Sequence, residues 1–214
     1  MGHVVKNLPW CTIDIDTTAG RVFLQERWLY HWRIQPPLAA WTEQEKWDFH
    51  NRADRCIWAA WSNRATLQPA GTSTFAVRFR TRGVPINLDI RRVTAREHWN
   101  VTVTKIPDDA FATSSVLWVA RRITLDSNDF NTRTFTHADG TETRQVPVAH
   151  EFGHAAGNTR TLARGDEYGS THVHVNDRAS ILNQGDRLRS RHFQTILDEL
   201  NTMIPDCTFT VGSV

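Results

Sequence analysis

Two histidines and a glutamate in the second half of the chain have the types and spacing that suit chemistry at a metal ion. His150, Glu151 and His154 form the pattern H-E-x-x-H. On a helix, residues four apart lie on the same face, so both imidazoles can present a nitrogen to one ion. Glu151 lies within reach of a zinc-bound water and can act as its general base. The pattern therefore predicts a catalytic zinc site.

The segment around this pattern has the start and stop signals of a helix. Pro147 suits the first helical turn, because its missing N–H has no partner there. Gly157 suits the position just beyond a helix end. We therefore expect a helix from Pro147 to about residue 156.

A catalytic zinc ion usually takes three protein ligands, so a further ligand is needed. The run 150–157 resembles the first part of the metzincin signature, H-E-x-x-H-x-x-G-x-x-H. Where that family has its third ligand, this chain has Arg160, and a cation cannot bind zinc. The later run Gly165-Asp-Glu-Tyr168 resembles the ending of snapalysin-type proteases, in which an aspartate replaces the third histidine. The resemblance implies that Asp166 is the third ligand and that residues 159–165 are an inserted loop.

Other ligands remain open. Glu167 is adjacent and could bind instead, as could His172 or His174, which an extended segment places on one face. In a gluzincin pattern the third ligand is a carboxylate on the last helix, here Asp198 or Glu199.

The same resemblance extends to a later turn, and a catalytic zinc site would use further residues. Residues 179–185 resemble the methionine-containing turn beneath the metzincin metal, with Leu182 at the methionine position. Tyr168 or His174 would stabilise an oxyanion. A strand at 115–124 would take a peptide as an added strand. The resemblance thus implies a zinc-dependent metallopeptidase with Zn²⁺ as cofactor and a peptide or protein as substrate.

The elements that position these residues follow from periodicity. Thr42 and Glu45 form a capping box before apolar residues at helical spacing, which predicts a helix at about 43–62. A second apolar stripe predicts a final helix at about 190–204, and Ala138-Asp-Gly140 predicts a hairpin turn. Alternating apolar residues predict strands within 12–34, 75–79, 84–90, 99–103, 115–124, 131–136 and 141–145.

These elements predict an α+β, zincin-like fold. We expect a mostly antiparallel twisted sheet with a backing helix, an active-site helix and a C-terminal helix. A single zincin-like metallopeptidase domain is expected over residues 1–214. It comprises a helix-and-sheet subdomain, 1–146, and a part with the metal-site helix, loop and C-terminal helix, 147–214.

Composition limits the partners. The chain has 25 Lys and Arg against 23 Asp and Glu, a net charge of +2, which gives no support to a nucleic-acid partner. No stretch has the length of a membrane span, and the N-terminus lacks the apolar run of a secretory signal. We therefore expect a cytoplasmic protein or one exported by a specialised secretion system.

Cys56 is expected to be a buried thiol, and the sequence leaves open whether Cys11 and Cys207 pair.

The chain also resembles the enzymatic payloads of bacterial toxin and contractile-injection systems. That likeness implies an effector with a secretion apparatus and an immunity protein as partners. The same residues fit two other interpretations: a zinc amidase or endopeptidase acting on peptidoglycan peptides, and a non-catalytic, zincin-shaped peptide-binding module. Four arginines are either solvated surface charge or a source of preference for acidic peptides: Arg121, Arg122, Arg160 and Arg164.

Overall fold

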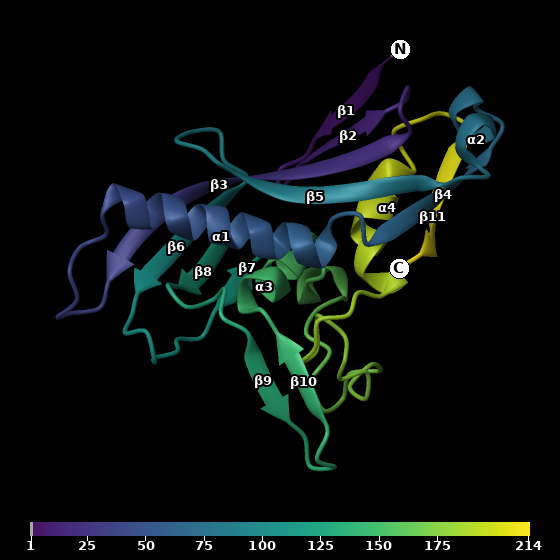
Figure 1. Ribbon diagram of the computed structural model, residues 1–214. Helices are drawn as coiled ribbons and strands as arrows, with labels where there is room; N and C mark the ends of the chain where they lie inside the picture. The colour runs from purple at the N-terminus through teal and green to yellow at the C-terminus, as the bar shows by residue number, and fades with distance from the viewer. Residues whose placement is uncertain (1) are drawn as a thin grey trace.

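The fold is organised around one long strand, β3 (Arg21–Ile34), in the computed structural model, which describes residues 2–214 (Figure 1). The first residues of β3 alternate between buried and partly exposed, as in a strand with one face on a core. β2 (Thr12–Asp16) and β5 (Val84–Arg92) flank its first half, and β6 (Trp99–Lys105) pairs with its second half. The segment 12–34 thus holds one short strand and one long strand.

The main sheet has nine strands and is mixed. β5 and β6 run parallel to β3, and β8 (Arg122–Asp126) runs parallel to β6. The expectation of a mostly antiparallel sheet is therefore corrected at the centre, because the chain between β3 and β5, residues 35–83, returns to the end of the sheet at which β3 begins. Antiparallel pairs lie at the flanks and involve β1 (His3–Asn7), β2, β4 (Ala65–Gly71), β7 (Ser115–Leu117) and β11 (Cys207–Ser213).

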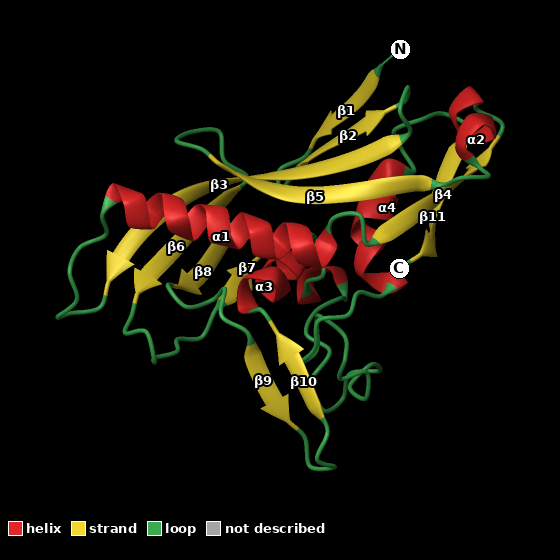
Figure 2. Ribbon diagram, viewed as in Figure 1, coloured by secondary structure: helices red, strands yellow, loops and turns green. Residues whose placement is uncertain are grey.

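The helix predicted at 43–62 is confirmed as α1 (Glu43–Trp61), which lies across one face of the sheet (Figure 2). Its capping box forms as expected. The Thr42 hydroxyl accepts the Glu45 N–H, and the Glu45 carboxylate accepts the Thr42 N–H at 2.7 Å. The apolar face of α1 packs into the core, and Trp61 at its end is fully buried.

The strand predicted at 75–79 is wrong, because this segment is the short helix α2 (Thr74–Phe79). The Ser73 side chain caps it by accepting the Ala76 N–H. Phe75 and Phe79 are four residues apart and pack with ring centres 4.8 Å apart. Their spacing fits one face of a helix as well as one face of a strand. The Ser73 cap favours the helix.

Two further predicted elements are shorter than expected. The strand predicted at 115–124 is interrupted by a turn in which Arg121 has φ 51°, so it divides into β7 and β8. The helix predicted at 190–204 is η2 (Ser190–Phe193) followed by α4 (Gln194–Leu200). The Asn201 side chain accepts the backbone N–H of Phe209 at 2.6 Å, which fixes the reversal into β11.

The predicted hairpin is confirmed as β9 (Arg133–Thr136) and β10 (Glu142–Gln145), a separate two-stranded sheet that projects from the main sheet in Figure 1. The three cysteines are free thiols, and Cys56 is partly exposed rather than buried. Within residues 2–214, no helix has the length and apolar character needed to cross a membrane.

Candidate metal centre

The H-E-x-x-H pattern lies on α3 (Pro147–Ala155), with Pro147 in its first turn as predicted. Trp61 of α1 donates its ring N–H to the carbonyl oxygen of Ala149 at 2.9 Å and packs against Phe152. A Cβ at Gly153 would lie 2.8 Å from the Trp61 ring, so glycine permits this close approach. The core therefore fixes the helix that carries the two histidines.

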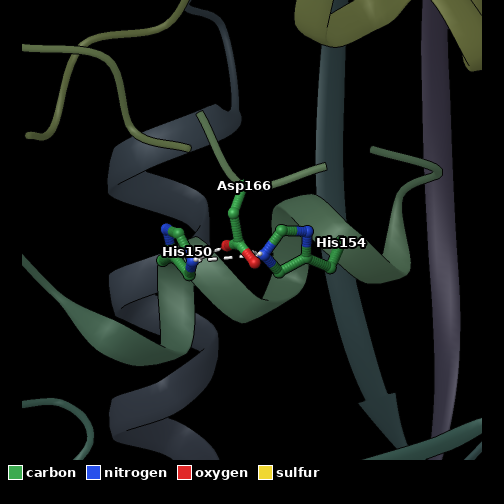
Figure 3. A group of neighbouring side chains, drawn as sticks. All are labelled: His150, His154 and Asp166. Atoms are coloured by element: carbon green, nitrogen blue, oxygen red, sulfur yellow. Dashed lines mark hydrogen bonds and ion pairs between the residues drawn. The ribbon is translucent and has the colours of Figure 1, made fainter. Parts of the chain in front are cut away.

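The side chains of His150, His154 and Asp166 converge on one point (Figure 3) and form what we call the metal cluster. Asp166 Oδ1 lies 3.0 Å from His154 Nε2 and 3.3 Å from His150 Nε2, and the two Nε2 atoms are 3.1 Å apart. Ligands about 2.0–2.1 Å from a tetrahedral zinc ion are separated by roughly 3.3 Å. Among residues 2–214 this is the single group of three or more His, Cys, Asp or Glu side chains gathered in this way.

The hydrogen bonds behind the two histidines determine which ring nitrogens are free. His150 Nδ1 lies 2.6 Å from the carbonyl oxygen of Ile181, and His154 Nδ1 lies 2.5 Å from that of Asn158. A carbonyl oxygen only accepts, so each Nδ1 carries a hydrogen and each neutral ring presents an Nε2 lone pair. These two lone pairs and the carboxylate oxygen of Asp166 meet at one point. Such a donor set fits a divalent transition-metal ion, zinc included.

The electrostatics of the metal cluster also favour a positive charge at its centre. Burial alone raises the pKa of Asp166, but the adjacent imidazoles of His150 and His154 hold that pKa well below its ordinary value. Burial alone lowers the pKa of His154, but Asp166 and Glu151 raise it above its ordinary value. A proton or a metal ion satisfies this preference, and only a metal ion contacts all three ligand atoms at once.

Asp166 reaches the histidines because the chain reverses after α3. Gly157 has φ +101°, which other residues rarely adopt, and a Cβ there would lie 2.4 Å from Thr195. Asn158 donates its side-chain amide to the carbonyl oxygen of Gly153, which holds the reversal against the helix. The loop of residues 159–165, which includes η1 (Arg160–Leu162), then returns the chain to the metal cluster.

A tight turn at residues 179–185 supports both parts of the metal cluster. The Ile181 carbonyl oxygen accepts from His150, and the Leu182 carbonyl oxygen accepts the N–H of Glu167 at 2.8 Å. Leu182 is 1% exposed and packs in the core. One short turn therefore holds the first histidine and the segment that carries the aspartate.

Glu151 is 7% exposed, and its Oε2 has no hydrogen-bond partner among the described residues. Burial raises the pKa of its carboxyl group, although His154 and His150 oppose this shift. The side chain lines the same cleft as His154 and Asp166. A carboxylate with one unpaired oxygen at this place suits proton transfer.

A cleft of about 630 Å³ opens at the metal cluster. Residues 113–120, which include β7, line one part of it, and residues 159–161 and Tyr168 line another. β7 is the last strand in the sheet order and pairs with β8 on one side. Its other edge therefore has backbone groups available for pairing with an extended chain.

The structure places the alternative ligands away from the metal cluster. Glu167 is buried in an ion pair with an arginine of η2, with contacts of 2.6 and 2.7 Å. His172 and His174 are partly exposed, with ring centres 5.6 Å apart. Asp198 and Glu199 lie on α4 and pair with basic side chains at 3.2 and 2.7 Å.

Tyr168 lies at the edge of the cleft. Its side chain is half exposed, and its ring stacks on that of His150 with centres 6.4 Å apart. Burial and the neighbouring Asp166 carboxylate raise the pKa of Tyr168 to about 12, so its hydroxyl keeps its proton at neutral pH. The hydroxyl therefore remains a hydrogen-bond donor.

Sequence reasoning missed the groups behind the histidines. Gln145, at the end of β10, lies 3.0 Å from His150 Nδ1 and donates to the carbonyl oxygen of Asn183 at 2.7 Å. The hairpin brings Gln145 to α3, and no sequence motif predicts its contact with His150. The acceptors from Ile181 and Asn158 are backbone groups, which no residue type reveals.

Comparison of the chain with protein-family models, with curated proteins and with solved structures finds no match.

Proposed function

We propose that this chain is a zinc-dependent metallopeptidase of metzincin-like type, with His150, His154 and Asp166 as the zinc ligands. One observation carries the proposal: both histidines donate Nδ1–H to backbone carbonyls, so two Nε2 lone pairs meet a carboxylate oxygen at 3.0–3.3 Å. Three protein ligands are typical of a catalytic zinc site, whereas a structural zinc ion is usually enclosed by four. The turn with Leu182 beneath the histidines is in keeping with the metzincin resemblance.

A zinc ion held there would supply Lewis acidity, which polarises a carbonyl group and lowers the pKa of water toward about 7. Glu151 acts as the general base, because its unpaired carboxylate oxygen lies in the cleft beside the metal cluster. It accepts the proton of the attacking water and delivers it to the leaving amine. Tyr168 lines the cleft, and its hydroxyl, protonated at neutral pH, would donate a hydrogen bond to the developing oxyanion.

The cleft supports an extended peptide as substrate. β7 has an unpaired edge along the cleft, so a substrate strand gains backbone hydrogen bonds without specific side chains. These bonds would hold the scissile carbonyl beside Glu151. Delivery of the protein as a toxin or effector by a secretion apparatus remains part of the proposal that rests on sequence resemblance alone.

The substitution Glu151→Gln tests the catalytic assignment. It keeps the size of a buried side chain but removes the base, so zinc content should stay near one ion per chain. Hydrolysis of denatured protein and of peptide libraries should fall at least about 100-fold, since general base catalysis contributes about 10²–10⁴-fold. Zinc content and peptide cleavage are measured on the same preparation.

Three outcomes separate the interpretations. Full activity in Glu151→Gln contradicts its role as base. A zinc-loaded parent that cleaves cross-linked peptidoglycan peptides but no protein or linear peptide supports the amidase or endopeptidase alternative. A zinc-loaded parent that binds peptides and cleaves none supports the binding module.

A further inference from the structure

The structure separates the four arginines that the sequence leaves as candidates for recognising acidic peptides. Arg121 stacks over Trp118 and donates to its carbonyl oxygen at 2.8 Å, so it is part of the packing. Arg164 donates to Thr195 at 2.6 Å and pairs with an aspartate of α4. Arg122 is exposed on β8 and does not line the cleft. Arg160 alone of the four is a cleft residue.

The charge of Arg160 is largely free. Its side chain is 83% exposed, and its one ion pair is a 3.9 Å approach to Asp166 Oδ2. By contrast, Arg189 and Arg191 in the same half of the chain reach carboxylates at 2.6 Å. The other oxygen of Asp166 belongs to the metal cluster, so this carboxylate is poorly placed to neutralise Arg160 as well.

The base of the Arg160 side chain is nevertheless held in place. A Cβ at Gly165 would lie 2.9 Å from Arg160 Cγ and 3.2 Å from its backbone nitrogen, so the two ends of the loop 159–165 touch. Arg160 begins η1, and the Thr159 side chain caps that turn. The loop thus fixes the backbone of Arg160 while its guanidinium reaches into solvent at the cleft.

Arg160 is the one lysine or arginine among the residues that line the cleft. The cleft's acidic and histidine side chains are Glu151, the proposed base, and His154 and Asp166, two of the proposed ligands. Residues 116–120 on the other wall are apolar. A peptide in the cleft therefore meets an apolar wall along β7 and a positive charge on the loop.

We propose that Arg160 makes this site select peptides with an acidic side chain close to the scissile bond. The inference deepens the proposed peptidase function and rests on it for the position of the scissile bond. An exposed pair between guanidinium and carboxylate is worth up to about 1 kcal/mol, or about 5-fold in affinity. We therefore expect a preference of about 3- to 5-fold for Glu over Gln at one substrate position, weakened by high salt.

The test uses the zinc-loaded full chain and short quenched fluorescent peptides that differ only in Glu, Gln or Lys at each position in turn. The same peptides, singly labelled, are titrated against zinc-loaded Glu151→Gln, where fluorescence anisotropy reports binding without cleavage. Each measurement is repeated with Arg160→Gln and Arg160→Glu. Arg122→Gln is the matched control, since it removes the same charge outside the cleft.

The proposal is supported if the preference for the Glu peptide over the Gln peptide, in cleavage and in binding, disappears in Arg160→Gln and persists in Arg122→Gln. In Arg160→Glu, the Lys peptide should become the preferred one. A ratio that survives Arg160→Gln, or no acidic preference at any position, overturns the assignment. If the parent binds peptides but cleaves none, the proposed peptidase function fails while the binding ratios still decide the role of Arg160. If no peptide binds, the role of Arg160 is contradicted too.

Discussion

Replacing Asp166 with alanine removes the one carboxylate of the metal cluster. Its Oδ1 lies 3.0 and 3.3 Å from the two histidine nitrogens, so it would bind an ion shared with them without rearrangement. Zinc binding by four-ligand peptide sites is worth about 10–16 kcal/mol, or roughly 2.5–4 kcal/mol for each ligand. Asp166→Ala should therefore raise the zinc Kd about 10²- to 10³-fold.

Competition against a chromophoric zinc chelator at neutral pH measures this change. His174→Ala and Asp198→Ala are the matched controls. Each removes a side chain that the sequence allows as a ligand but that is not part of the metal cluster. Both controls should keep the parent Kd within about 2-fold. An unchanged Kd in Asp166→Ala, or a large loss in either control, would refute the assignment of the third ligand.

Two further predictions concern stability. Glu167→Gln breaks a buried ion pair with Arg191. The free energy of unfolding should therefore fall by about 3 kcal/mol and Tm by about 6–12 °C. Weakened zinc binding at unchanged Tm would contradict this structural role. Burial, with a smaller effect of Arg92, lowers the pKa of His50 to about 4. The unfolded chain then binds more protons between about pH 6.5 and 4, so stability falls as pH falls through this range, by up to about 3 kcal/mol. Urea unfolding of His50→Gln at pH 7 and 4.5 should show a smaller pH effect than the parent, and an equal effect in both proteins would contradict the assignment.

Sequence reasoning was most successful where local signals agreed with the tertiary structure. The Thr42 capping box, the proline start of α3 and the Asp-Gly hairpin each specify their element locally, and each is present. It failed where two periods fit the same residues, as at Phe75 and Phe79, and where tertiary contacts end an element, as at Asn201.

The candidate metal centre was likewise predicted in part. Helix geometry explains why His150 and His154 lie together. Asp166, which the family resemblance singles out, also lies beside them. The mixed sheet was not predicted, because parallel and antiparallel neighbours have similar residue patterns. Gln145 and the backbone acceptors were missed because they reach the histidines through folding of distant segments.

The turn at residues 179–185 has a consequence for how this protein can change. It holds His150 on one side and the residue after Asp166 on the other, so the loop 159–165 need not position the aspartate by itself. Doubling the length of a flexible loop costs only about 0.6 kcal/mol. The loop can therefore be lengthened, shortened or exchanged between proteins as a separate module. If the proposed function holds, substrate preference can diverge in this loop while His150, His154 and Asp166 keep their relative positions.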